Sequence, residues 1–151
     1  MAFTVDRSRS IISALILGRK ITSLDVAWLR REVFADGQVS REQADELFAV
    51  ERANLATADE WTEFFVEMIT DHIVWQARPT GVVSGPQAEW LLKRADECAS
   101  ANALAALVNV LTEAHRVPQW LIAAVKARVK SGWRGVEAKL ARAKTGLKPV
   151  A

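Results

Sequence analysis

The stretch "ADGQVSREQADEL", from Ala35 to Leu47, decides how we interpret the fold, because it joins a tight turn to the start of a helix. Gly37 permits the positive φ that a tight turn requires. The letters "SREQ" form a capping box, in which the Ser40 hydroxyl accepts from the Gln43 N–H and the Gln43 side chain reaches back to Ser40. The stretch therefore predicts a loop followed by a helix that starts at Ser40.

Helical patterns account for nearly all of the remaining sequence. The 151 residues are rich in Ala, Leu, Glu and Arg, contain only seven Gly and four Pro, and give no β-hairpin signal. We therefore predict an all-α fold, a single-domain bundle of six to seven helices. The expected helices are 10–17, 24–34, one starting at Ser40, a long one from a Thr57 capping box to about Gln76, and three more capped or started at Ser84, Ser100 and Pro118.

Charge divides the chain into unequal parts that the net charge of +2 conceals. Residues 32–71 contain eleven acids and two arginines, whereas residues 116–151 contain nine basic residues and one acid. We assign residues 1–134 to one helical domain and residues 135–151 to a basic C-terminal tail. Such a dipolar chain can pair its own halves or present each half to a different partner.

The opening stretch has a second, degenerate copy. "GQVSREQADEL" (37–47) and "GVVSGPQAEWL" (81–91) match at six of eleven positions with a constant offset of 44. Two such helix–turn–helix units predict an EF-hand-like pseudo-repeat. We therefore expect Val39 and Val83 to lie close together, joined by a short antiparallel bridge as in paired EF-hands.

The calcium-loop pattern itself fails in both copies. With Gly37 as the central glycine, Phe34 falls at a ligand position and Gln43 replaces the bidentate Glu. In the second copy Arg78 would place a cation where calcium should bind. We therefore do not expect an EF-hand calcium site.

The long fourth helix carries an acidic stripe at helical spacing, beside an apolar face that includes His72. Like charges three or four residues apart repel by a few tenths of a kcal/mol, so solvent, the basic tail or a divalent cation must compensate them. We expect His72 to be a hydrogen-bonded residue at the edge of the core. The acidic stripe consists of Glu60, Glu63, Glu67 and Asp71.

Other signals limit the classes of function. There is no phosphate-binding glycine loop, no CxxC, HExxH or GxSxG motif, and no run approaching the ~20 apolar residues of a membrane span. The one cysteine, Cys98, fits a buried thiol in a reducing compartment. We therefore expect a cytoplasmic protein that is not an enzyme and has no cofactor beyond a weakly bound divalent metal. Trp133 is the one of six tryptophans that we expect at an interface.

Helix pairs joined by a "DGxVS" turn and followed by an acidic helix resemble the TerB-like tellurite-resistance family of bacterial all-α domains. The resemblance covers about residues 21–130. It implies a stress-related role and a negatively charged patch that binds a divalent metal, here at Asp36, Glu42 and Glu46. The sequence departs from the family pattern where Gln43 replaces a Glu and Thr80 replaces an Asp. The matching positions are Asp36, Gly37, Val39, Ser40 and Leu47.

Two functions follow from these patterns. The leading one is a non-enzymatic TerB-like domain that acts by protein interaction, with an unknown protein partner or as a homo-oligomer. The alternative is an adaptor whose basic tail binds nucleic acid or an acidic protein. The residues expected to make those tail contacts are Lys126, Arg128, Lys130, Arg134, Lys139 and Arg142.

Overall fold

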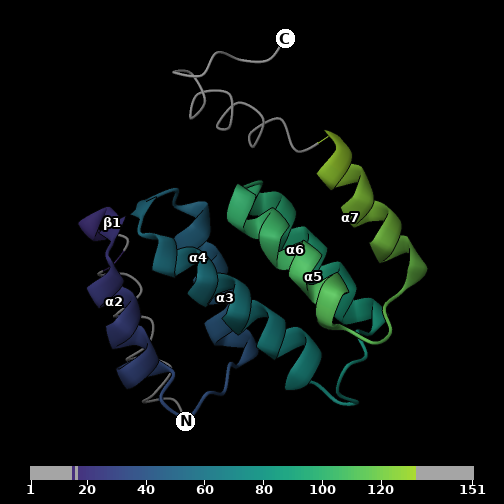
Figure 1. Cartoon of the computed structure of the whole chain (residues 1–151), viewed down its shortest axis with the longest axis horizontal. Coiled ribbons are helices and arrows are strands. Elements are labelled where there is room, and N and C mark those ends of the chain that lie inside the picture. Colours follow the sequence, from purple (N-terminus) through teal and green to yellow (C-terminus); the bar gives the residue numbers. More distant parts are fainter. Residues whose placement is uncertain (1–14, 16, 132–151) are drawn as a thin grey trace.

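The computed structural model describes residue 15 and residues 17–131, and in this part the chain forms six α-helices, two π-helical turns and one pair of short strands (Figure 1). The all-α prediction is confirmed. Most of the expected first helix and the whole 135–151 tail lie outside the described residues. The elements are β1 (Lys20–Ile21), α2 (Ser23–Trp28), η1 (Leu29–Val33), α3 (Arg41–Arg52), β2 (Ala56–Thr57), α4 (Asp59–Thr70), η2 (Asp71–Trp75), α5 (Gly85–Cys98), α6 (Ala101–Glu113) and α7 (Gln119–Ser131).

Short-range caps start most of the helices where the sequence places them. The Ser40 hydroxyl accepts the Gln43 N–H at 3.0 Å while the Gln43 side chain accepts the Ser40 N–H at 3.0 Å, so the predicted capping box is confirmed. Thr22 forms a second box with Asp25 at the start of α2. Ser84 and Ser100 cap α5 and α6 in the same way, each accepting a backbone N–H three residues ahead.

The predicted capping box at Thr57 is wrong. Thr57 belongs to β2, which pairs in parallel with β1 so that Thr57 lies opposite Ile21. The helix α4 begins two residues later, and its N-cap is Ala58, whose side chain makes no cap hydrogen bond. Acidic residues in the first turn, Asp59 and Glu60, still suit the positive end of the helix dipole.

Helix α4 is the centre of the bundle and packs against α2, α3 and α6. Its apolar face, with Trp61, Phe64 and Phe65, is fully buried. Phe65 meets Phe48 of α3 edge-to-face at 5.2 Å between ring centroids, a favoured aromatic geometry. Figure 1 shows α2 and α7 on opposite sides of the bundle, with α7 resting on α6.

Side-chain hydrogen bonds set the direction of α6 relative to α4. Thr62 bonds to Asn102 at 2.8 Å, and Asn109 donates to Thr70 at 2.8 Å. Contacts that advance together along both helices mean that α4 and α6 run side by side in the same direction. Helix α7 packs against α6.

The two loops of the internal repeat agree locally and differ in their surroundings. Gly37 has φ of 74° and Gly81 has φ of 80°, as the tight-turn prediction requires. The Gly37 carbonyl accepts from the Gln76 side chain, whereas the Gly81 carbonyl accepts the backbone N–H groups of His115 and Arg116. Because the contacts are different, a structural duplication of whole units is not established.

The predicted bridge between Val39 and Val83 is wrong. The Val39 N–H donates to the Gln76 side chain at 2.7 Å, and the Val39 carbonyl bonds to His72 at 2.8 Å. The Val83 N–H donates to the Arg116 carbonyl at 2.9 Å, next to a parallel bridge between Val82 and Arg116. The side chains of His72 in η2 and of Gln76, which follows η2, bond to the backbone of the first loop in place of the second loop.

Candidate functional site

The carboxylates predicted to bind metal lie around the first loop and α3. Asp36 Oδ1 accepts the Gln38 N–H at 2.9 Å and so stabilises its own turn. Glu42 is exposed and Glu46 is half-buried on α3. Among residue 15 and residues 17–131, no group of three His, Cys, Asp or Glu side chains is placed to hold a metal ion. The three carboxylates therefore do not form a ready-made site, and metal binding stays a prediction.

One residue of the acidic stripe, Glu67, is paired with a cation that the sequence did not indicate. Arg30 of η1 forms an ion pair with Glu67 at 2.9 Å and lies over the Phe64 ring at 5.0 Å. Glu60 and Glu63 are exposed on the same helix. The ion pair joins residues 37 positions apart, a separation that helical spacing cannot reveal.

Asp71, the last residue of the stripe, has a different environment. Burial raises its pKa, and the nearby charges of Glu67 and Glu113 raise it further, while Arg30 opposes them. Glu113 is held in place by Trp75, whose Nε1 donates to it at 2.7 Å, and by Asn109 at 3.1 Å. The residues that fix Glu113 come from η2 and α6, so the acidic surface continues from α4 onto α6.

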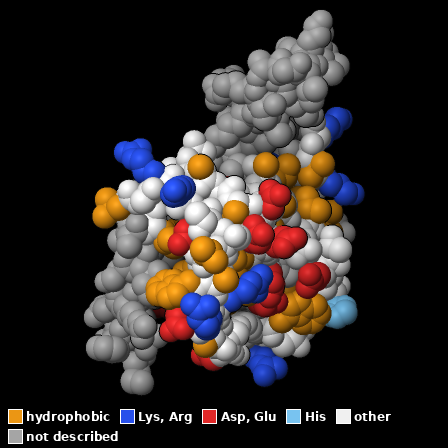
Figure 2. Space-filling view, turned by 60° about the vertical axis from the view of Figure 1, so that its left-hand side comes forward, with side chains coloured by type: hydrophobic (Ala, Val, Ile, Leu, Met, Phe, Trp, Pro, Cys, Tyr) orange, Lys and Arg blue, Asp and Glu red, His pale blue; other side chains and the backbone are white. Residues whose placement is uncertain are grey.

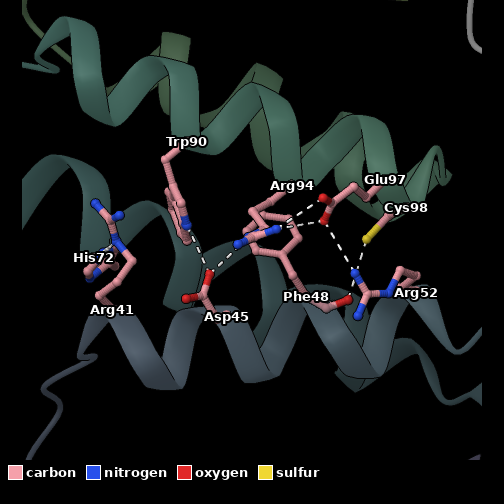
Figure 3. A network of polar contacts seen from close by, with 9 residues as sticks. All are labelled: Arg41, Asp45, Phe48, Arg52, His72, Trp90, Arg94, Glu97 and Cys98. Atoms are coloured by element: carbon pink, nitrogen blue, oxygen red, sulfur yellow. Dashed lines mark hydrogen bonds and ion pairs between the residues drawn. The ribbon is translucent and has the colours of Figure 1, made fainter.

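A ladder of polar contacts, which we call the α3–α5 seam, joins α3 to α5 (Figure 3). Asp45 accepts hydrogen bonds from Trp90 Nε1 at 2.9 Å and from Arg94 at 3.0 Å. Glu97 in turn binds Arg94 at 2.9 Å and Arg52 at 3.3 Å. Each charge thus meets an opposite charge from the facing helix or the next turn, which indicates a structural role. The seam consists of Asp45, Arg52, Trp90, Arg94 and Glu97.

His72 lies at the end of this seam as the sequence predicts, hydrogen-bonded at the core boundary. Its Nε2 faces Arg41 Nε at 3.4 Å, so Nε2 is the acceptor and Nδ1 carries the hydrogen that bonds to Val39. Burial lowers the pKa of His72, and the charge of Arg41 adds to that effect. Arg41 also stacks on Trp90 at 4.3 Å. A neutral imidazole therefore fits this position.

The basic residues predicted to bind a partner fall into three groups. Arg128 holds Asp96 of α5 with two hydrogen bonds of 2.8 Å, which fastens α7 to the bundle. Lys126 and Lys130 are exposed on another face of α7. The remaining three, Arg134, Lys139 and Arg142, lie outside the described residues, as does Trp133.

An open apolar hollow runs between α6 and α7 and reaches the edge of α4; we call it the α6–α7 groove. It consists of two adjoining parts of about 540 and 340 Å³, which share Val108, Thr112 and Val129. Val108 is 40 % exposed and Val129 is 55 % exposed, high fractions for valines. Figure 2 shows a face on which exposed hydrophobic side chains lie next to acidic and basic ones. The other apolar lining residues are Val66, Ala101, Leu104, Ala105, Leu111 and Val125.

The sequence does contain a signal for this groove. "ANALAALVNVL" is apolar on more than one face of a helix, and such a helix is either buried all round or leaves an apolar surface uncovered. In the structure α4, α5 and α7 all pack against α6, and Val108 of α6 still remains 40 % exposed. The excess of apolar residues in α6 therefore predicts the groove.

A second hollow of about 570 Å³ lies between α5 and the start of α7, beside the half-exposed Trp120. Its lining is largely charged, and two of its carboxylates are already engaged. Asp96 holds Arg128, and Glu97 belongs to the α3–α5 seam. This hollow therefore has less free capacity for a ligand than the α6–α7 groove.

Comparisons with known protein families, with curated proteins and with solved structures found no match for this chain. Among the described helices, none has the length and apolar character needed to cross a membrane. The geometry of the described residues is therefore what supports a function.

Proposed function

We propose that this chain is a non-catalytic TerB-like helical domain that acts by binding another protein chain in the α6–α7 groove. The observation that carries the proposal is the exposure of Val108 and Val129 over an apolar floor. Contiguous exposed apolar surface with a polar rim is typical of protein interaction sites. Covering it removes apolar area from water, which stabilises a complex by roughly 25 cal/mol per Å² before the costs of association.

Two described side chains of types that often act in catalysis, His72 and Cys98, support a non-catalytic function. Each forms a hydrogen bond with a backbone carbonyl of this chain. His72 Nδ1 bonds to Val39, and Cys98 Sγ donates to the Phe48 carbonyl at 3.4 Å. A nucleophile or a general base needs to face a substrate rather than the backbone of its own helix bundle.

The TerB-like part of the proposal is supported by the first loop. The positive φ of Gly37, the turn made by Asp36 and the Ser40 capping box form the turn on which the resemblance depends. The stress-related role and the cytoplasmic location are part of this proposal and derive from the resemblance and from the use of a single cysteine.

The metal part of the proposal is limited to a weak divalent site at Asp36, Glu42 and Glu46. Thermal unfolding with and without millimolar Ca²⁺, Mn²⁺ or Zn²⁺ tests it, because a metal that binds the folded state raises Tm. A rise that disappears in Asp36→Asn supports this site. An unchanged Tm at every metal concentration removes the metal from the proposal.

Photo-crosslinking tests the interaction. A photo-reactive amino acid replaces Val108 in the full chain in cells that make the protein, and a matched variant carries it at the exposed Ala53 at the end of α3. We expect a discrete crosslinked protein product from position 108 and none from position 53. Equal products from both positions, or none from position 108, would contradict the proposal.

The nucleic-acid alternative has less support in the described residues. Arg128, one of its expected contacts, is bound to both carboxylate oxygens of Asp96 through Nε and Nη2, and its Nη1 donates to the Ala124 carbonyl. Retention of the full chain on DNA that weakens as salt is raised would favour this alternative.

A further inference from the structure

The two rims of the α6–α7 groove carry opposite charge. On one side Lys126 and Lys130 line the groove from α7 and lie one helical turn apart. On the other side Val66 lines it from α4, and the exposed Glu63 lies one turn before Val66 on that helix. Glu60 lies one turn before Glu63 and farther around the helix from Val66. An apolar floor therefore separates a basic rim from an acidic rim.

These rim charges are available to a partner. Within the described part of the chain, the side chains of Glu60, Glu63, Lys126 and Lys130 form no hydrogen bond or ion pair, and all four are exposed. By contrast, the neighbouring Glu67 and Arg128 have a structural role, because each forms an ion pair with a residue of another helix. The four rim groups are thus exposed and face no partner among the described residues.

We propose that the groove binds a second copy of this chain, forming a two-fold symmetric dimer. The inference rests on the function proposed above and names its partner. In a two-fold interface the same patch meets itself, so the acidic rim of one copy lies opposite the basic rim of the other, twice. The apolar floors then meet at the centre, with Val108 and Val129 covered. A foreign partner would have to supply both rims, whereas this chain already carries both.

The shape of the site agrees with this arrangement. Val108 and Val129 belong to both parts of the hollow and therefore lie near its middle. Apolar centre and charged rim is the usual anatomy of a protein interface. The rim charges select the partner and its orientation, while the covered valines contribute most of the affinity.

Sedimentation equilibrium of the full chain over a range of concentrations tests the dimer. We expect a reversible monomer–dimer equilibrium whose dissociation constant rises at least ~100-fold in the double variant Val108→Glu/Val129→Glu, because two carboxylates would be buried at the interface centre. Leu24→Glu is the matched control: it replaces a 79 % exposed hydrophobic residue of α2 and should leave the dissociation constant unchanged. Circular dichroism checks that each variant is folded.

Charge reversal tests the two-fold pairing directly. Lys126→Glu/Lys130→Glu and Glu60→Lys/Glu63→Lys should each weaken self-association by about tenfold, since like charges then face each other across the interface. Mixing the two variants should restore a heterodimer, because both rim contacts are then complementary, one with the native charges and the other with the two charges exchanged. Lys93→Glu on α5 is the control charge reversal and should have no effect.

The outcomes separate this inference from the proposed function. A dimer unaffected by the groove variants, or no recovery on mixing, overturns the two-fold pairing. A monomer at all concentrations also overturns it. Suppose that the monomer binds an apolar fluorescent dye, that Val108→Glu/Val129→Glu abolishes this binding, and that position 108 crosslinks to a different protein. The interaction function then stands, with another partner. A monomer that neither binds dye nor crosslinks contradicts both.

Discussion

The α3–α5 seam and the α6–α7 groove are both surfaces between helices, and they are built in opposite ways. In the seam, Asp45 and Glu97 each receive donors from two side chains, and Trp90 fills the space between the helices. In the groove, valines are exposed and the lysines at the rim have no described partner. The comparison teaches that contacts completed within one chain hold the fold, and we propose that the incomplete contacts of the groove mark where another chain binds.

The largest effect is expected for Trp90→Ala in the seam. Trp90 packs edge-to-face on Phe48 at 5.6 Å, lies under Arg41 and donates to Asp45. Its removal should lower the free energy of unfolding by roughly 2–4 kcal/mol, measured by urea denaturation. The half-exposed Trp120 is the control, and Trp120→Ala should cost less than about 1 kcal/mol. Equal losses would show that the seam is not a structural contact.

A smaller effect is expected for Arg94→Met, which keeps the length of the side chain and removes its charge. Asp45 and Glu97 would both lose a donor in a partly buried setting, so the expected loss is about 1–2 kcal/mol of unfolding free energy. Arg31→Met is the matched control, because the Arg31–Glu32 pair is exposed and worth about 0–0.5 kcal/mol. If Arg31→Met proves as costly as Arg94→Met, the seam contributes no more than a surface ion pair.

His72 gives the seam a dependence on pH. Its folded-state pKa lies below the ordinary value of about 6.5, so the unfolded chain binds the proton more readily. Its contribution to stability is therefore complete above about pH 6.5 and is lost as the pH falls toward the lowered pKa. We expect the unfolding free energy of His72→Gln to fall less between pH 7 and pH 5.5 than that of the unaltered chain.

If His72→Gln keeps the full dependence on pH, the neutral imidazole between Arg41 and Val39 is not its source.

The smallest effect on stability is expected in the groove. Val129→Glu should change the unfolding free energy by no more than ~0.5 kcal/mol, because more than half of that side chain is already in water. Urea denaturation is carried out at a concentration where the chain is monomeric, since association also adds to apparent stability. Val125→Glu, on the same helix but 2 % exposed, should be severely destabilised. A large loss in Val129→Glu would mean that the groove is part of the core.

Local features of this fold could be predicted from the sequence, and distant pairings could not. The Ser40 capping box and the positive φ of Gly37 depend on residues within a few positions, so the pattern determines them. Thr57 has the same sequence pattern, but the capping box predicted there is wrong, because Thr57 lies in β2 and pairs with Ile21 of β1. The bond between Asp45 and Trp90 spans 45 positions, and nothing periodic connects the two.

The candidate site shows the same division. The acidic stripe of α4 could be predicted from helical spacing, but the groove that Val66 of α4 and the two lysines of α7 line depends on the packing of α4, α6 and α7. The apolar excess of α6 is visible in the sequence, but which of its residues stay exposed depends on how α4, α5 and α7 pack on it. Half of the predicted tail residues lie beyond the described part of the chain, and Arg128 has a structural partner instead.

The most direct test compares one variant from each region by the dissociation constant of self-association, measured by sedimentation equilibrium. Arg94→Met should lower the unfolding free energy and leave the dissociation constant unchanged. Val108→Glu/Val129→Glu should leave the unfolding free energy nearly unchanged and raise the dissociation constant at least ~100-fold. If the groove variant associates as tightly as the unaltered chain, the central claim that this groove is the surface for another chain is contradicted.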